Sequence, residues 1–210
     1  MATPRRPRPP APDPGHGLVL VRGQAQASAR WLRRGLVAAA VVPLPGWTGV
    51  VLTEERARSQ APYDVGLEVL AARPTPRGSR PSIGLFVLDG RAVVTVQPRG
   101  WRADQRWLIW EPGVGVRRMP DLRVLPAALI VQVSGAARRG VSAADVGAHF
   151  REVDGIPLER LVGLLRLLGL PGEDLLRHGP LAGAATVEPS AQAVRVFDAL
   201  AAGEDMEEQS

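Results

Sequence analysis

The sequence contains no cysteine, no lysine and no asparagine. Without cysteine the chain cannot form a disulfide, an iron–sulfur cluster, a cysteine-ligated zinc site or a thiolate nucleophile. Without lysine it lacks the phosphate-binding lysine of a P-loop and the amine needed for a Schiff base. The lysine and the magnesium-binding asparagine of protein kinases are absent for the same reason. These absences disfavour most large enzyme classes, and we expect no cofactor.

All 26 positively charged side chains are arginines. Codons for lysine and asparagine are rich in A, so their absence indicates a genome of high GC content, and a bacterial one is expected. The sequence contains no nucleophile elbow, no H-E-x-x-H zinc motif and no calcium-binding loop. No motif identifies a family. The sequence therefore predicts a binding or regulatory protein rather than an enzyme.

The charges are distributed unevenly along the 210 residues. Residues 1–118 contain 18 Arg against 8 Asp and Glu, a net charge of +10, and residues 119–210 contain 8 Arg against 13 Asp and Glu, a net charge of −5, which together give the net charge of +5. A basic first part suggests an anionic partner. The alternative is that arginine merely replaces lysine on an ordinary surface.

Both termini have compositions typical of disordered chain. Residues 1–17 contain six prolines together with Arg5, Arg6 and Arg8. Residues 203–210 are acidic, and we expect both segments to be disordered. Between them we predict a sheet domain over residues 18–140, a helical subdomain over residues 141–179, and a linker with an amphipathic helix over residues 180–202.

One stretch is long enough to cross a bilayer. Residues 35–53 form a run of 19 residues without a charge, preceded by Arg33 and Arg34, and such a run raises the alternatives of a membrane span or an export signal. Pro43 and Pro45 would break a helix there. The run is also consistent with the end of one helix followed by a buried strand. We therefore expect a cytoplasmic protein that does not contact a membrane.

The pattern of apolar residues predicts an α+β fold with a β-α-β start, a mostly antiparallel sheet and a helical C-terminal region. Short strands are expected at residues 18–22, 47–53 and 65–71, with a helix over residues 24–39 between the first two. Asp89-Gly90 suits a type I′ turn, so residues 83–88 and 91–96 are expected to form a hairpin in which Leu88 faces Arg91.

A second hairpin is expected over residues 106–111 and 114–118, around Pro112-Gly113, which suit the central positions of a type II turn. In the simplest register Trp107, Ile109, Val114 and Val116 share one face, and the other face carries Arg106, Leu108, Trp110, Arg117 and Met119. A bulge or a longer loop would exchange these faces.

Several helices are expected in the last third of the chain. Residues 125–133 are ambiguous between helix and strand. Ser142 and Asp145 resemble a capping box, Pro157 suits the first turn of a helix that ends at Gly169, and a short helix should follow Pro171-Gly172 and end near His178. A final amphipathic helix is expected over residues 189–202.

Three candidate sites emerge from the side chains. Asp145, His149 and Glu152 lie at helical spacing and could share a metal ion or a proton, as in a hydrolase or a metal-dependent enzyme, but no further ligand is evident. The helices at residues 142–151 and 157–168 resemble a helix-turn-helix in spacing only, because the second offers few polar side chains for a DNA groove.

The third candidate is a surface that combines arginine with tryptophan, and it consists of Arg99, Trp101, Arg102, Arg106, Trp110 and Arg117. Tryptophan and arginine are the residues enriched at protein interfaces, so a protein partner is the first hypothesis. The same side chains bind single-stranded nucleic acid by stacking on bases and neutralising phosphates, which is the alternative. A third interpretation is that the tryptophans belong to the core and the arginines are simply solvated.

Overall fold

The computed structural model describes residues 15–100, 104–181 and 183–208. These residues contain one eight-stranded sheet in the order β7-β6-β5-β4-β1-β3-β2-β8, with antiparallel pairing throughout. The predicted α+β fold with a mostly antiparallel sheet is confirmed. The strands are β1 (Gly17–Val21), β2 (Ala39–Leu44), β3 (Trp47–Leu52), β4 (Ser82–Leu88), β5 (Arg91–Gln97), β6 (Arg106–Glu111), β7 (Gly115–Arg117) and β8 (Thr186–Val187).

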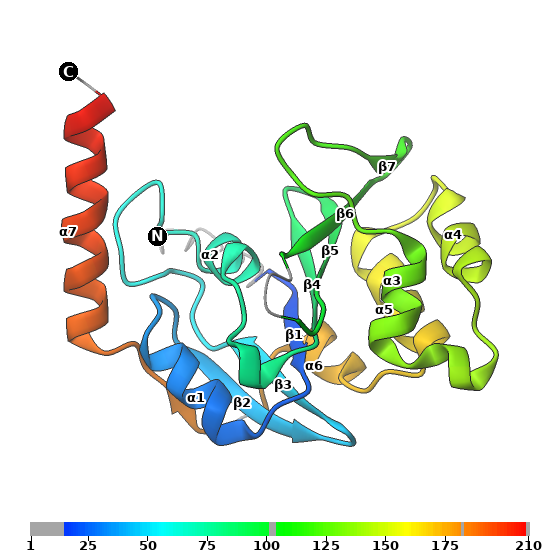
Figure 1. Ribbon diagram of the computed structural model, residues 1–210, viewed down its shortest axis with the longest axis horizontal. Coiled ribbons are helices and arrows are strands. Elements are labelled where there is room, and N and C mark those ends of the chain that lie inside the picture. Colours follow the sequence, from blue (N-terminus) through cyan, green and yellow to red (C-terminus); the bar gives the residue numbers. More distant parts are fainter. Residues whose placement is uncertain (1–14, 101–103, 182, 209–210) are drawn as a thin grey trace, which may run out of the picture.

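Helices cover both faces of this sheet, as Figure 1 shows. One face is covered by α1 (Ala25–Arg33) and α2 (Gly66–Ala72), with α7 (Ala191–Glu208) at its margin. The opposite face is covered by α3 (Ala127–Ser134), α4 (Ala143–Arg151), α5 (Pro157–Leu168) and α6 (Glu173–His178).

The central strand β1 explains how one sheet supports two cores. Successive side chains of a strand point to opposite faces. Leu18 and Leu20 therefore join the apolar cluster under α3 to α6, whereas Val19 and Val21 join the cluster under α1 and α2. All five residues of β1 are buried, which is why its sequence is a continuous apolar run rather than an alternating one.

The start of the chain contains a strand that the sequence analysis missed. The helix predicted over residues 24–39 ends at Arg33, and Ala39 begins β2, which pairs with β3 around Pro45-Gly46. Gly35 follows the helix closely, and a Cβ there would collide with a guanidinium nitrogen of Arg73. Because β2 and β3 together occupy most of residues 35–53, this uncharged run is mainly a β-hairpin. Among the described residues, no helix combines the length and apolarity that crossing a bilayer requires.

The strand predicted over residues 65–71 is wrong, because Gly66–Ala72 is the helix α2. The apparent alternation covered only a few residues. The buried side chains instead follow the i, i+3, i+4 spacing of a helix, at Leu67, Leu70 and Ala71. Val65, which the predicted strand would bury with Leu67, is exposed.

The hairpin around Asp89-Gly90 is confirmed in its predicted register, with Leu88 opposite Arg91 and Val87 opposite Ala92. Both central residues of the turn have positive φ, 48° for Asp89 and 70° for Gly90, as a type I′ turn requires. Because helices cover both faces of the sheet, both faces of this hairpin are buried. Phe86 and Val93 lie on the face that is covered by α1 and α2.

The helices of the last third also follow the prediction. The ambiguous segment before Ser134 is helical as α3. Ser142 and Asp145 form the capping box of α4, and α5 begins at Pro157 and ends before Gly169, whose φ is +56°. The helix α6 ends at His178.

The termini differ in part from the expected disordered tails. The predicted N-terminal tail reached residue 17, but Gly17 already belongs to β1 and the backbone oxygen of His16 accepts a hydrogen bond from the N–H of Val87. The remaining part of that prediction, residues 1–14, lies outside the described residues. At the other end α7 continues to Glu208, so most of the predicted acidic tail is helical. The division of the chain into domains stays a prediction.

Candidate functional site

The second hairpin has a register one residue away from the simplest one. The N–H of Val114 donates to the carbonyl of Glu111, so the predicted turn around Pro112-Gly113 is present. However, Gly115 has a φ of +88° and pairs with Glu111, which leaves Val114 as an extra residue in the loop. A glycine with positive φ next to a turn is typical of a bulge. Arg117 consequently lies opposite Ile109 instead of sharing a face with Trp110.

Trp110 is completely buried, which contradicts its predicted outward position. Its indole Nε1 donates to the backbone oxygen of Glu152 at 2.9 Å. The guanidinium of Arg160 lies over its ring, with 4.8 Å between Cζ and the ring centroid. Trp110 is therefore a core residue that joins β6 to the segment between α4 and α5.

The other residues of the predicted arginine and tryptophan surface are separated from one another. Arg117 forms an ion pair with Glu111 at 3.4 Å, and half-buried Arg106 donates to the backbone oxygen of Val124 at 3.5 Å. Arg99 is exposed at another end of the sheet, where it contributes to the groove described below. Trp101 and Arg102 lie outside the described residues.

The group around His149 is structural. The imidazole Nε2 lies 2.8 Å from the carbonyl oxygen of Arg160, and burial lowers the pKa of His149, an effect that this hydrogen bond opposes. The carboxylate of Asp145 accepts hydrogen bonds from the backbone N–H and the hydroxyl of Ser142, which lower its pKa. Glu152 pairs with Arg160 at 2.9 Å. Each of the three side chains thus has its own partner, and they do not converge on one ligand.

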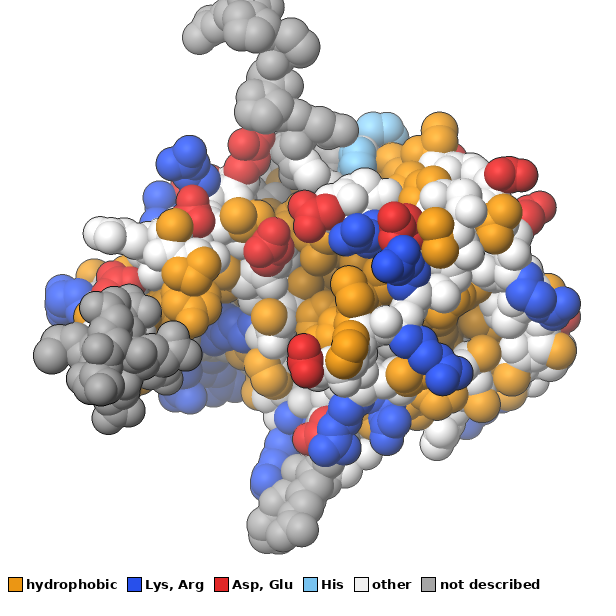
Figure 2. All heavy atoms as spheres, turned by 90° about the horizontal axis from the view of Figure 1, so that it is seen from above, with side chains coloured by type: hydrophobic (Ala, Val, Ile, Leu, Met, Phe, Trp, Pro, Cys, Tyr) orange, Lys and Arg blue, Asp and Glu red, His pale blue; other side chains and the backbone are white. Residues whose placement is uncertain are grey.

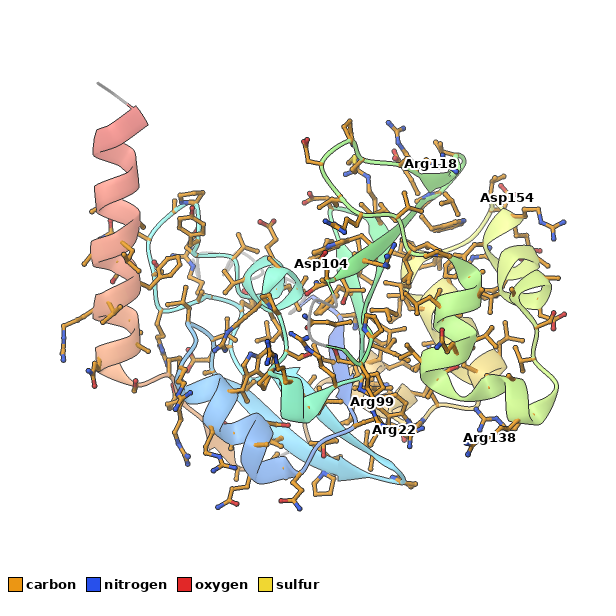
Figure 3. The ribbon with its side chains drawn as sticks, viewed as in Figure 1. Arg22, Arg99, Asp104, Arg118, Arg138 and Asp154 are labelled. Atoms are coloured by element: carbon orange, nitrogen blue, oxygen red, sulfur yellow. The ribbon has the colours of Figure 1, made fainter. Side chains whose placement is uncertain are left out.

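Three other arginines do converge, at one end of the sheet. The pairing of β1, β4 and β5 places Val21 beside Ser82 and Ser82 beside Gln97. The chain segments that follow β1 and β5 therefore leave the sheet next to each other. They carry Arg22 and Arg99, which lie close together in Figure 3. Arg138 lies farther out, on the short 3-10 helix η2 (Ala136–Arg139), and lines the same groove.

We call this feature the arginine groove. Its volume is about 550 Å³, and it is lined by Arg22, Pro81, Pro98, Arg99, Val131, Gln132, Val133, Gly135, Ala137 and Arg138. This volume falls within the range of ligand sites, which is roughly 300 to 1,000 Å³. The lining combines three positive charges with apolar surfaces and one amide, and it includes no carboxylate.

Arg22 is held in a defined position. Its Nη1 donates to the carbonyl of Gly46 at 3.2 Å, and its Cζ lies 4.2 Å from the centroid of the Trp47 ring. A guanidinium stacked in this way is attracted by the electrons of the ring. Arg22 is nevertheless exposed, so part of its guanidinium remains accessible to a ligand.

The other two arginines retain most of their donor groups. Within the described part of the chain, Arg99 uses only Nε in a hydrogen bond, to the carbonyl of Arg80 at 3.4 Å. Arg80 in turn donates to the carbonyls of Thr75 and Gly100, and so fixes the loop that carries Arg99. Within the described residues Arg138 has neither a hydrogen-bond nor an ion-pair partner. Among the described residues, the groove therefore contains three exposed arginines that no carboxylate neutralises.

Several other arginines of the molecule are neutralised by ion pairs. Arg166 and Arg177 both pair with Glu173, and Arg58 pairs with Glu54 and Glu188. The face seen from above in Figure 2 likewise carries Asp and Glu side chains among its arginines. Burial lowers the pKa of Arg80 near the groove, and the neighbouring charge of Arg77 lowers it further. The groove end of the sheet is consequently a region of positive potential.

The chemistry available in the groove is that of anion recognition. Arginine presents planar donors that match phosphate and carboxylate oxygens, and it stays charged at every physiological pH. The lining side chains include no imidazole, carboxylate or hydroxyl that could transfer a proton. Over the described residues, His, Asp and Glu do not assemble into a group of three or more that could hold a metal ion.

Sequence analysis identified Arg99 but missed Arg22 and Arg138. Neither residue lies near Arg99 in the chain, and only the strand register brings Arg22 to it. A signal for both arginines was available in the sequence, because each lies at or just after the end of a predicted element and away from acidic residues. Arg22 directly follows β1, and Arg138 lies on η2, shortly after α3 ends at Ser134. Comparison with protein-family models, with curated proteins and with solved structures gave no match for this chain.

Proposed function

We propose that this protein is a non-enzymatic binding protein that holds single-stranded nucleic acid by its phosphates in the arginine groove. The observation that carries the proposal is the convergence of Arg22, Arg99 and Arg138 on a groove whose lining includes no carboxylate. Unneutralised arginines at one place repel one another and gain little from the fold, so their arrangement is best accounted for by an anionic ligand.

The remaining lining favours a nucleotide over a simple anion. Half-buried Pro98 and exposed Ala137 provide apolar surface beside the arginines, which suits sugars and bases. The accessible face of the Arg22 guanidinium can stack on a base, as arginine does in many complexes with RNA. An acidic segment of a partner protein would use the charges but not these flat apolar contacts.

A titration with labelled oligonucleotide tests this proposal. We expect a fluorescein-labelled oligothymidylate to raise its fluorescence polarisation on binding the full chain. Single-strand binding loses about 0.7 in the slope of log K against log salt per neutralised phosphate, so three contacts predict a fall in affinity of about 20-fold from about 50 to about 200 mM salt.

Variants assign the binding to the groove. Arg138→Gln should weaken binding several-fold and reduce the salt slope by about 0.7, since one phosphate contact is lost. The matched control is Arg118→Gln, which removes an exposed arginine that Figure 3 shows at the opposite end of the sheet. Equal losses in the two variants would show that only net charge matters and would contradict the proposal. Equal competition by polyglutamate would instead favour an acidic protein partner.

We place this binding in the cytoplasm. The proposal is supported by the position of residues 35–53, whose apolar side chains are part of the sheet. Cleavage of an export signal near Ala40 would remove β1, the strand that joins β4 to β3. Mass spectrometry of the protein from its native cells should therefore show an N-terminus upstream of β1, and a mature N-terminus near Ala40 would contradict this location.

A further inference from the structure

The C-terminal helix α7 lies at the margin of the fold, as Figure 1 shows. It spans 18 residues, and none of its described side chains, from Ala191 to Gly203, is buried. A few contacts hold it: the ring of Phe197 packs edge-on against Tyr63 with 5.0 Å between centroids, and Asp198 accepts a hydrogen bond from Ser59 at 2.7 Å. Helices of this length depend on packing of an apolar face, because an isolated helix is marginally stable in water.

Two large apolar side chains of α7 are exposed. Val196 is 54% exposed and Leu200 is 64% exposed. Both lie on one stripe of the helix with Ala193, because the three residues have the i, i+3, i+7 spacing of a helical face. The same side chains line a groove of about 460 Å³ whose other wall includes Arg34. A projecting leucine and a groove beside it on one surface are the elements of a self-complementary contact.

The charges along α7 indicate how two copies would pair. The N-terminal end of the helix adjoins exposed Arg33 and Arg34, and the N–H of Ser190 donates to the carbonyl of Arg33 at 2.8 Å. The sequence of the C-terminal end is acidic from Glu204 to Glu208. The surface beside the N-terminal end of α7 is therefore basic and the sequence of its C-terminal end is acidic, which favours an antiparallel arrangement of two identical helices.

We infer that α7 is the interface of a homodimer in which two α7 helices pack antiparallel around a two-fold axis. In this arrangement Val196 of each chain faces Leu200 of the other, and Ala193 faces Gly203. The acidic end of each helix then lies beside Arg33 and Arg34 of the other chain. The contact covers the exposed leucine and opposes the two helix dipoles favourably.

The mass of the full-length protein in solution is the first test. Light scattering during size exclusion should give twice the chain mass of 22.4 kDa. Leu200→Glu should return the mass to that of one chain, because a charge would be buried at the centre of the contact. Leu181→Glu is the matched control, since Leu181 is 76% exposed and borders a different pocket beside Val42 and Leu44, and this variant should remain dimeric. A monomeric wild-type chain, or equal effects of the two substitutions, would overturn the inference.

Disulfide formation tests the orientation without relying on a disruptive substitution. The chain has no cysteine, so any disulfide must come from introduced residues. A mixture of the single variants Val196→Cys and Leu200→Cys should form a mixed dimer under mild oxidation, while each variant alone should cross-link far less. Preferential cross-linking of Val196→Cys to itself would show a parallel pair, and no cross-linking in the mixture would exclude the contact. Neither result depends on ligand binding to the arginine groove.

Discussion

Two regions of the molecule use arginine in opposite ways. At the corner between α4 and α5, Arg160 is 7% exposed and donates to the carbonyl oxygens of His149 and Asp154 and to the carboxylate of Glu152. In the arginine groove, Arg22, Arg99 and Arg138 are exposed and have no carboxylate partner among the lining residues.

This difference separates an arginine that stabilises the fold from arginines that are free for a ligand. The Arg160 guanidinium joins α5 to two backbone carbonyls and one carboxylate of residues 149–154, and it also lies over the ring of Trp110. The charge of Arg160 is paired with the carboxylate of Glu152, whereas the arginines of the groove have no carboxylate partner among the lining residues. Substitutions in the two regions should therefore affect different measurements.

The largest effect is expected for Trp110→Ala. This substitution removes a fully buried ring and its hydrogen bond to Glu152, so the free energy of unfolding should fall by about 3 to 5 kcal/mol. Urea denaturation followed by circular dichroism measures the change. Trp107→Ala is the control, because Trp107 lies on the same strand but is only half-buried. Equal losses for the two tryptophans would contradict the structural role assigned to Trp110.

Arg160→Met should have the next largest effect. Methionine can fill much of the space, but the carbonyls of His149 and Asp154 lose a charged donor, and we expect a loss of about 2 to 3 kcal/mol. The same denaturation experiment applies. A variant as stable as the wild type would show that the buried guanidinium does not stabilise this corner.

His149 should make the α4–α5 corner sensitive to pH. Burial lowers the pKa of His149 in the folded protein, so below its ordinary pKa of about 6.5 the unfolded chain binds more protons than the folded one. Stability should then decrease as the pH falls from about 7 towards 5, by at most about 1.4 kcal/mol per pH unit for one proton. Denaturation of His149→Gln should be less dependent on pH across this window. An unchanged pH dependence would assign it to other groups.

The smallest effect on stability is expected in the arginine groove. Arg138→Gln removes an exposed side chain, so the free energy of unfolding should change by less than about 0.5 kcal/mol. The melting temperature, measured beside the oligonucleotide titration, checks this. A loss comparable to that of Arg160→Met would remove the contrast between the two regions.

The sequence alone determined those features that depend on neighbouring residues. The register of the hairpin at Asp89-Gly90 follows from the turn geometry, and the capping box at Ser142 and Asp145 needs only a spacing of three residues. The helix from Pro157 is likewise defined by its first residue, its leucine spacing and the glycine after it. In each case the deciding interaction is local, so the pattern was sufficient.

The tertiary structure decided the features that depend on distant contacts. Trp110 is buried because α4 and α5 cover its face of the sheet, and a single extra loop residue before Gly115 moved Arg117 to the opposite face. The helix α2 stands where a strand was predicted, because a short apolar segment is compatible with both helical and strand spacing. Only the packing of Leu67, Leu70 and Ala71 against the sheet decides in favour of the helix. The arginine groove has the same origin, because Arg22, Arg99 and Arg138 are far apart in the chain. Their charges come together only because β1 pairs with β4 and β4 pairs with β5, with α3 packed beside these strands.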